Sequence, residues 1–353
     1  MMYIRKFVAA SLAAFSVYIV YFHIYRSHRL LRTKVLCSDT LPSLIYLYTK
    51  FFSRAMSSRK GCLRKTAPPN VKVEAEYTVT SCRLDSVSLR RFCSAAGYGW
   101  DYPDTEYRDI PLCFPEFLCG RLMLMVLTDD SFRLNPAGLV RISQSLKTFQ
   151  PIDELKKSRF SLRAQVLLYR QTDAGVEVDI CLSAMSRSGS PVWESVLTLL
   201  SNKQQRGGDR GSTQRDRENR PNEPDPENMK EVQLRVPWRT GLLCWWSFFD
   251  HSLYRLLSLP VKLLGFRSQT APGLWMLSTC LAEIEKHKGV EAVTAPAKVT
   301  AQFKEPLLIP GDVVIRIWEM DRESDKSIYQ DFGFQMQQHR GSITHMVGMI
   351  HRG

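Results

Sequence analysis

Residues 250–283 read DHSLYRLLSLPVKLLGFRSQTAPGLWMLSTCLAE, and the second half of this stretch decides the fold. Pro272 is followed by residues 273–285, in which apolar side chains recur at helical spacing, so we predict that a helix begins here. Strand-like runs follow this helix and continue almost to the C-terminus. These four runs cover residues 297–303, 312–320, 328–337 and 343–351. One helix is therefore followed by a meander of strands.

The same order of elements occurs earlier in the chain. Residues 114–127, FPEFLCGRLMLMVL, are apolar on most faces, which predicts a buried helix. An alternating run over residues 71–80 predicts a strand before it, and turn residues at 173–175 and 188–191 separate strands after it. These later strands are predicted over residues 139–149, 160–170, 176–185 and 192–200. One buried helix wrapped by an antiparallel sheet, occurring twice, predicts an α+β fold of two hot-dog units, with two unrelated α+β domains as the alternative.

The N-terminus is first apolar and then basic. Residues 7–24, FVAASLAAFSVYIVYFHI, are at the short end of the roughly 17–25 residues that span a bilayer. Four basic residues follow within residues 26–34 and two precede the run, so the positive-inside bias places the body in the cytosol. We predict an N-terminal transmembrane helix and a single-pass protein of the endoplasmic reticulum membrane. A mitochondrial presequence and a cleaved signal peptide are the alternatives. Residues 41–52 are too short to span, so an interfacial or a core helix is predicted there.

A polar segment separates the two halves. Residues 201–230 contain one large apolar residue, Met229, among charges, glycines and prolines. Such a segment cannot bury enough apolar surface to offset the entropy lost on ordering, so we predict a disordered linker. The predicted domains are an anchor with a basic juxtamembrane segment (1–65), a degenerate N-terminal hot-dog unit (66–200), the linker (201–230) and a C-terminal hot-dog unit (231–353).

The charge and the cysteines exclude several classes of protein. The net charge is +13, but residues 1–65 hold twelve Lys/Arg against one acid, so the rest of the chain carries only about +2. A nearly neutral body argues against a nucleic-acid partner. The nine cysteines include no CxxC pair and do not resemble a disulfide framework or a zinc site.

The motifs in residues 250–283 resemble the signature of the MaoC-like (R)-specific enoyl-thioester hydratases and 3-hydroxyacyl-thioester dehydratases. That signature is D-x-N-P-I-H, then a short helix ending in G-F, then A-H-G at the start of the central helix. Residues 304–311, KEPLLIPG, resemble the strand and turn that follow in the family. Residues 111–152 resemble the degenerate first unit of its double hot-dog members. The resemblance covers most of residues 70–353.

The resemblance implies a catalytic site. In the family, an aspartate and a histidine share a water and act as general acid and base, while a backbone N–H at the start of the central helix contacts the thioester oxyanion. Asp250 falls at the aspartate position, and Gly273 falls at the glycine that supplies the N–H and lets the carbonyl approach. The residues that the resemblance places against the substrate are Ser252, Phe266, Ala271, Pro272 and Trp275.

The chain departs from the family at both histidines. Arg255 stands at the histidine of D-x-N-P-I-H, and Pro272 stands at the histidine of A-H-G. A guanidinium stays protonated at physiological pH, so Arg255 cannot replace an imidazole as acid and base. It could pair with Asp250, or bind a carboxylate or phosphate of a ligand.

The sequence therefore leaves two main functions open and does not decide whether the protein is an enzyme. The first is a membrane-anchored hydro-lyase that acts on 3-hydroxyacyl or 2-enoyl thioesters in fatty-acyl metabolism. The second is a pseudoenzyme of the same fold that binds acyl thioesters or protein partners. A hot-dog thioesterase that uses a lone carboxylate is a third hypothesis. The substrate would be carried on coenzyme A or phosphopantetheine, and no metal or redox cofactor is implied. A homodimer is an open alternative for the assembly.

Overall fold

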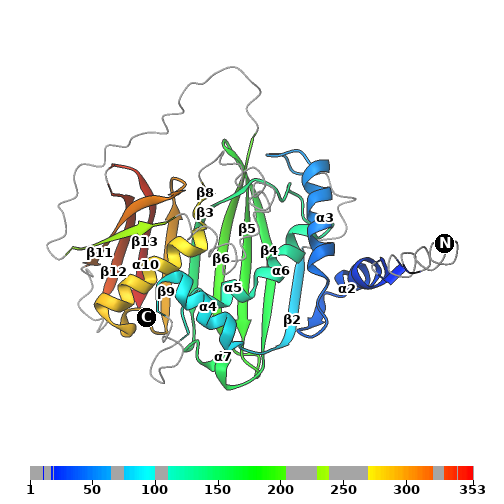
Figure 1. The fold of residues 1–353 in the computed structure, drawn as a ribbon, viewed down its shortest axis with the longest axis horizontal. Helices are drawn as coiled ribbons and strands as arrows, with labels where there is room; N and C mark the ends of the chain where they lie inside the picture. Colours follow the sequence, from blue (N-terminus) through cyan, green and yellow to red (C-terminus); the bar gives the residue numbers. More distant parts are fainter. Residues whose placement is uncertain are drawn as a thin grey trace, which may run out of the picture.

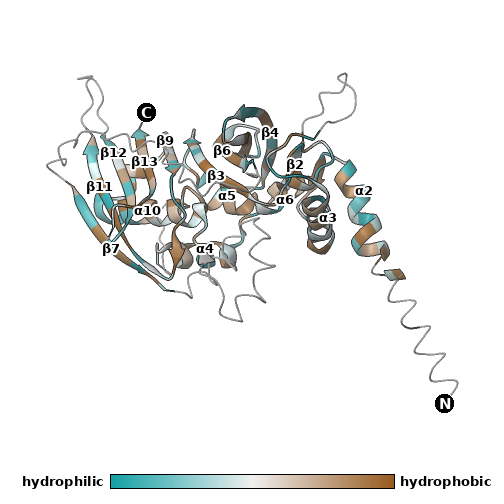
Figure 2. Ribbon diagram, turned by 90° about the horizontal axis from the view of Figure 1, so that it is seen from above, coloured by the Kyte–Doolittle hydropathy of each residue, from teal (hydrophilic) through white to brown (hydrophobic). Residues whose placement is uncertain are grey.

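One large sheet runs through the computed structural model of this chain (Figure 1). Its strands have the order β1-β2-β4-β5-β6-β3-β9-β13-β12-β11-β7, and the helices lie along one side of this curved layer (Figure 2). The structure describes residues 11, 17–18, 20–64, 75–99, 110–203, 229–237, 269–320, 330–339 and 341–352.

Five strands of each half have the same spatial order within this sheet, to which β1 (Val35–Cys37) adds an eleventh strand at the N-terminal edge. In each half, the order across the sheet is first, third, fourth, fifth and second along the chain. This repeated order confirms the two-unit, double hot-dog architecture and excludes two unrelated domains. The N-terminal strands are β2 (Glu76–Cys82), β3 (Leu139–Thr148), β4 (Phe160–Thr172), β5 (Gly175–Met185) and β6 (Pro191–Asn202). The C-terminal strands are β7 (Lys230–Val236), β9 (Ala297–Phe303), β11 (Gly311–Met320), β12 (Asp331–Gln338) and β13 (Thr344–Arg352).

A buried helix fills the concave side of each half. In the C-terminal half, this helix is α10 (Gly273–Lys288), in which every residue from Leu274 to Glu285 is buried. In the N-terminal half, the single helix predicted over 114–127 is two helices, α5 (Phe114–Leu118) and α6 (Gly120–Thr128). The break falls next to Gly120, a residue with poor helix propensity.

The two halves join through their second strands, β3 and β9, which pair antiparallel. Gln144 lies opposite Ala301, and Leu146 lies opposite Val299, all four buried. The apolar side chains of both halves belong to one continuous core. The junction is therefore the interior of a single folded body, and a residue of one half can reach the helix of the other.

The N-terminal segment contributes to this body. The strand β1 (Val35–Cys37) pairs parallel with β2, and the helix α3 (Leu44–Ser57) packs on α6. Leu47 and Phe51 of α3 are completely buried. The helix expected over residues 41–52 is therefore present as a core helix, and the structural boundary of the N-terminal unit lies before residue 65.

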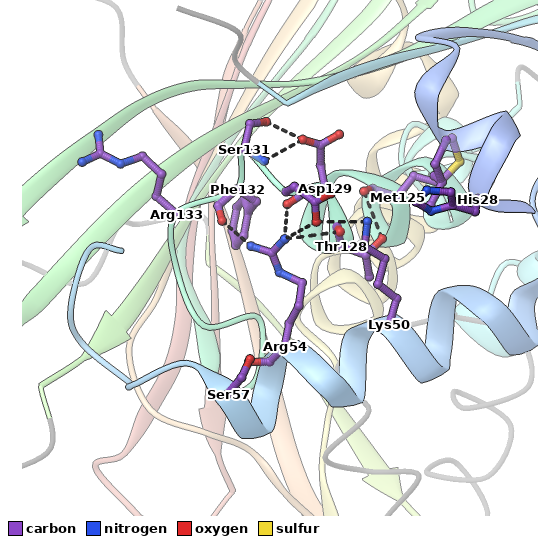
Figure 3. A network of polar contacts seen from close by, with 12 residues as sticks. His28, Lys50, Arg54, Ser57, Met125, Thr128, Asp129, Ser131, Phe132 and Arg133 are labelled. Atoms are coloured by element: carbon purple, nitrogen blue, oxygen red, sulfur yellow. Dashed lines mark hydrogen bonds and ion pairs between the residues drawn. The ribbon is translucent and has the colours of Figure 1, made fainter. Parts of the chain in front are cut away.

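Arg54 fastens α3 to the end of α6 (Figure 3). Its guanidinium donates to the carbonyl oxygens of Thr128 (3.4 Å) and Asp129, which the end of the helix leaves without helical partners, and to that of Phe132 (2.5 Å) in the turn that follows. The Asp129 carboxylate accepts from Lys34 Nζ at 2.8 Å and from the Tyr77 hydroxyl. Burial alone would raise the pKa of Asp129, but these hydrogen bonds and those from Ser131 lower it to about 2.

Several elements were not foreseen from the sequence. The helix α4 (Ser86–Ala96) is capped by the Asp85 carboxylate, which accepts from the backbone N–H of Val87 and Ser88, and it ends at Gly97 with φ of 86°. The strand β7 lies where the sequence predicts the end of the linker and the start of the second unit. The other short elements are η1 (Val20–Tyr25), α2 (Arg26–Arg32), α7 (Glu154–Lys157), β8 (Gln269–Thr270), η3 (Val290–Val293) and β10 (Leu308–Ile309).

The predicted transmembrane helix does not appear among the residues that the structure describes. Within the part of the chain that the structure describes, no helix combines the length and the apolar character needed to cross a membrane. Most of the predicted span, residues 7–24, lies outside the described residues. The described end of this segment, η1, leads away from the body beside α2 (Figures 1 and 2).

Candidate active site

The start of α10 lies at the junction between the halves. Pro272 is the residue before the helix and Gly273 is its first residue, and the Pro272 carbonyl accepts from the N–H of Met276 at 3.1 Å. The first N–H groups of a helix carry its positive dipole end and have no partner within the helix. They can therefore bind an oxyanion if a ligand reaches them.

The segment before this helix is held by the second motif of the sequence. The backbone N–H of Ala271 donates to Leu307 O at 2.8 Å, and β8 pairs antiparallel with β10. Residues 304–311, KEPLLIPG, therefore lie directly beside Ala271-Pro272-Gly273. The structure thus joins two of the motifs that carry the family resemblance.

Gly273 faces two side chains at close range. A Cβ atom on Gly273 would come within 3.0 Å of Arg141 Cδ and 3.1 Å of Phe303 Cε1. Both distances are shorter than ordinary carbon–carbon contacts, so a larger residue would have to push a neighbour aside. We use the name Gly273 recess for the position that a Gly273 Cβ would take, between Arg141 and Phe303. Because Arg141 is in β3 and Phe303 is in β9, both halves of the chain build it.

Arg141 is held by a buried polar network. Its Nη2 donates to Glu116 Oε1 at 2.5 Å, and its Nη1 donates to Gln144 Oε1 at 3.0 Å. Gln144 in turn donates to Glu116 Oε2 at 2.7 Å and approaches Ser195 Oγ at 2.9 Å. The Glu116 side chain is only 4% exposed and that of Arg141 is 15% exposed. A buried charge is tolerated when it is paired and hydrogen-bonded in this way.

The local shape of β3 explains how Arg141 reaches this network. The register of β3 against β6 shifts between Arg141 and Ser143. A bulge of this kind changes the direction of the side chains beside it. Arg141 can therefore reach the same network as Gln144, three residues further along β3, with its guanidinium 5.8 Å from the centre of the Phe303 ring.

The structure accounts for only some of the predicted site residues. Ala271, Pro272 and Gly273 lie together at the start of α10. Trp275 is buried, and its indole N–H donates to Ala95 O in α4 at 2.9 Å, so this side chain holds α4 against α10. The predicted residues that lie outside the described part of the chain are Asp250, Ser252, Arg255 and Phe266.

Sequence reasoning missed the polar network beside Gly273. Glu116 was visible as the acid within the apolar run of residues 114–127, which is an unusual place for a charge. Arg141 and Gln144 gave no such signal, because their neighbours come from distant parts of the chain. His345 was also missed: it is buried, burial lowers its pKa, and its Nδ1 bonds Glu305 O at 3.2 Å beside the second motif.

A surface depression of about 470 Å³ lies elsewhere, lined by Gln150, Glu154, Ser158 and residues 186–188. It is close to the end of β3 opposite to Arg141, and it contains no element of the thioester motif. We therefore do not assign it to the candidate site.

Comparisons with known proteins agree with this architecture. No protein-family model and no curated protein sequence matches the chain. Among solved structures, HtdX of Mycobacterium tuberculosis is 17% identical with a TM-score of 0.57 over 79% of this chain and 99% of its own. A MaoC-like dehydratase from Phytophthora capsici is 16% identical, with a TM-score of 0.55 over 79% and 95% of the two chains. Another MaoC-like dehydratase is 12% identical, with a TM-score of 0.59 over 80% and 98%.

Identity this low establishes the fold and leaves the activity to be argued from the site. The strand order, the two buried helices and the adjacency of the two motifs are all features of this chain itself. The chain has the double hot-dog fold of the MaoC-like dehydratases.

Proposed function

We propose that this protein binds acyl thioesters at the start of α10 and catalyses their hydration or dehydration. The observation that carries the proposal is the position of Gly273, the first residue of a buried central helix at the junction of two hot-dog units. A glycine at this point has no side chain of its own to oppose a thioester carbonyl, and the helix presents backbone N–H groups to that carbonyl.

The proposed chemistry uses the backbone of Gly273 and the carboxylate of Asp250. The Gly273 N–H would bind the thioester oxygen and stabilise the negative charge that develops on it. Asp250 would take a proton from water while the water oxygen bonds to C3 of a 2-enoyl thioester. Return of that proton to C2 gives the 3-hydroxyacyl thioester, and the reverse sequence is dehydration. The role of Asp250 rests on the sequence resemblance.

Two arginines favour a second function, which is to bind acyl thioesters without a reaction. Arg255 replaces the histidine of the family motif. The methylene groups of the Arg141 side chain, which we call its stem, already lie against Gly273. A protein of this kind would bind an acyl thioester without turning it over. This alternative keeps the ligand class and removes the reaction.

We also propose that the protein associates with a membrane through its N-terminal helix. Large apolar side chains of the described end of this helix are exposed to solvent, and Arg26, Arg29 and Arg32 follow them. Apolar residues next to basic ones suit an anionic bilayer surface. The exposed residues are Val17, Tyr18, Val20, Tyr21, Phe22, Ile24 and Tyr25. The proposal is tested by flotation of the full chain with phosphatidylcholine vesicles that contain or lack phosphatidylserine; a failure to float with either composition would refute it.

The enzymatic proposal is tested with the full-length protein and 2-enoyl-CoAs of short and medium chain length. We expect hydration by the native protein and its loss in Asp250→Ala. No hydration by the native protein, with a gain in Arg255→His, would support the binding protein instead. If every variant is inactive and no acyl-CoA raises the melting temperature, both thioester functions are wrong.

A further inference from the structure

The Gly273 recess is filled by the protein itself. The nearest atom to the space that a Gly273 Cβ would take is Arg141 Cδ, and the next atoms belong to the Phe303 ring. In the proposed function, a glycine is needed here so that a thioester can lie close to the helix. The stem of Arg141 and the thioester would compete for this space, because two groups cannot share it without clashing.

The polar network keeps the Arg141 stem in this position. The guanidinium is bonded to both Glu116 and Gln144, which are buried and are bonded to each other. These bonds fix the far end of the side chain, so that the methylene groups between it and β3 lie across the recess. The N-terminal half thereby controls a position on the helix of the C-terminal half.

When Arg141 leaves, Glu116 loses its cation, but the polar side chains that remain keep hydrogen-bond partners. The Arg141 side chain keeps 15% of its surface exposed, which gives it a route to solvent. When it leaves, Glu116 still accepts from Gln144 Nε2 at 2.7 Å. Gln144 is itself held at 2.9 Å from Ser195, so the remaining polar groups have partners within the N-terminal half.

We propose that Arg141 is the residue that determines thioester access to Gly273, because its stem must move out of the recess before a ligand can bind. This inference rests on the proposed thioester-binding function. Arg141 acts by excluding the ligand, so it is a specificity-determining residue and takes no part in the chemistry. A short side chain at position 141 opens the recess, and an unbranched side chain of the same reach keeps it closed.

Two double variants of the full chain separate the stem from its charge. Arg141→Ala/Glu116→Gln removes the stem and leaves no buried carboxylate without its cation. Arg141→Met/Glu116→Gln has the same change of charge, but the methionine sulfur reaches as far as Arg141 Cδ and fills the recess. Binding of crotonyl-CoA and of 2-decenoyl-CoA is measured by calorimetry, and thermal unfolding shows that each variant is folded. Arg141→Ser with native Glu116 is the second open variant if the first does not fold, because Gln144 still donates to Glu116.

We expect the open variant to bind at least about tenfold more tightly than the native protein, and the methionine variant to bind within about threefold of it. Equal gains in both variants would show that charge, and not the stem, limits binding, and would overturn the proposal. Binding by the native protein with no gain in the open variant would also overturn it, while the proposed function would stand. If neither the native protein nor any variant binds, the thioester function itself fails and the inference fails with it.

Discussion

A proline lies near the start of the central helix in each half, but the residue that follows it differs. Pro272 precedes α10 and Gly273 is the first residue of that helix, whereas Pro115 and Glu116 are the second and third residues of α5. Gly273 has no side chain where Arg141 and Phe303 approach the helix, whereas Glu116 contributes a buried carboxylate. Two units with the same fold therefore have different chemistry: the N-terminal unit provides the polar network, and the C-terminal unit provides the helix start suited to an oxyanion.

The largest expected effect comes from removing the buried carboxylate of Glu116. Glu116→Ala leaves the Arg141 guanidinium largely buried without its carboxylate, which should destabilise the protein by about 3 kcal/mol. Urea unfolding measures the loss. Glu116→Gln is the matched control, since its amide oxygen can still accept from Arg141, and it should cost clearly less. Equal losses in the two variants would show that the ion pair contributes little.

The next prediction tests whether the start of α10 tolerates a side chain larger than that of Gly273. Gly273→Ala places a methyl group 3.0 Å from Arg141 Cδ and 3.1 Å from Phe303, so we expect a loss of about 2 kcal/mol in the free energy of unfolding. Gly341→Ala is the control, because its nearest neighbour would be 3.7 Å away. If the Gly273→Ala variant is as stable as the Gly341→Ala variant, Arg141 and Phe303 lie further from Gly273 than the structure shows.

Acid should weaken the N-terminal half through Asp129. Because the folded pKa of Asp129 is lowered to about 2, its contribution is complete above the unfolded value near 4 and is lost as the pH falls towards 2. The contribution is about 2 kcal/mol at neutral pH. We expect Asp129→Asn to be less stable than the native protein at pH 7 and equal to it near pH 2, as measured by unfolding across this range. A difference that does not change with pH would contradict the assignment.

The smallest effect compares the two buried tryptophans. Trp193 donates to Leu112 O at 2.8 Å in the N-terminal half, and Trp275 donates to Ala95 O at 2.9 Å in the C-terminal half. Replacement of either by Phe leaves a carbonyl without its partner and should cost about 1 kcal/mol in thermal or urea unfolding. We expect the larger loss for Trp193→Phe, because Trp193 is 0% exposed and Trp275 is 3% exposed. The reverse order would show that the α4–α10 contact is the tighter one.

The strands and helices in which apolar residues recur at regular spacing were predictable from the sequence. The strand over residues 297–303 was placed with the bounds that the structure has, and the helix at Gly273 was placed with its correct first residue. The helix α4 was missed although Asp85 and Gly97 are ordinary signals for a helix start and end. The strand β7 was missed although Val232, Leu234 and Val236 alternate with polar residues, because it is a short edge strand that begins at the last residue of the predicted linker.

The candidate site was predictable only along one stretch of chain. A motif reports residues that are close in sequence, and Ala271, Pro272 and Gly273 were found in this way. Arg141 and Gln144 reach the site through the pairing of β3 with β9, strands about 150 residues apart, and through a bulge in β3. Neither the register of such a pairing nor the position of a bulge can be read from local spacing.

The sequence by itself determined that the chain has two helix-and-meander units and that a glycine begins the second central helix, because apolar periodicity and backbone freedom are local properties. Only the tertiary structure decided that the N-terminal half places Arg141 against that glycine. This contact depends on the pairing of β3 with β9 and on a buried carboxylate at Glu116 that holds the guanidinium, and both are properties of the folded body.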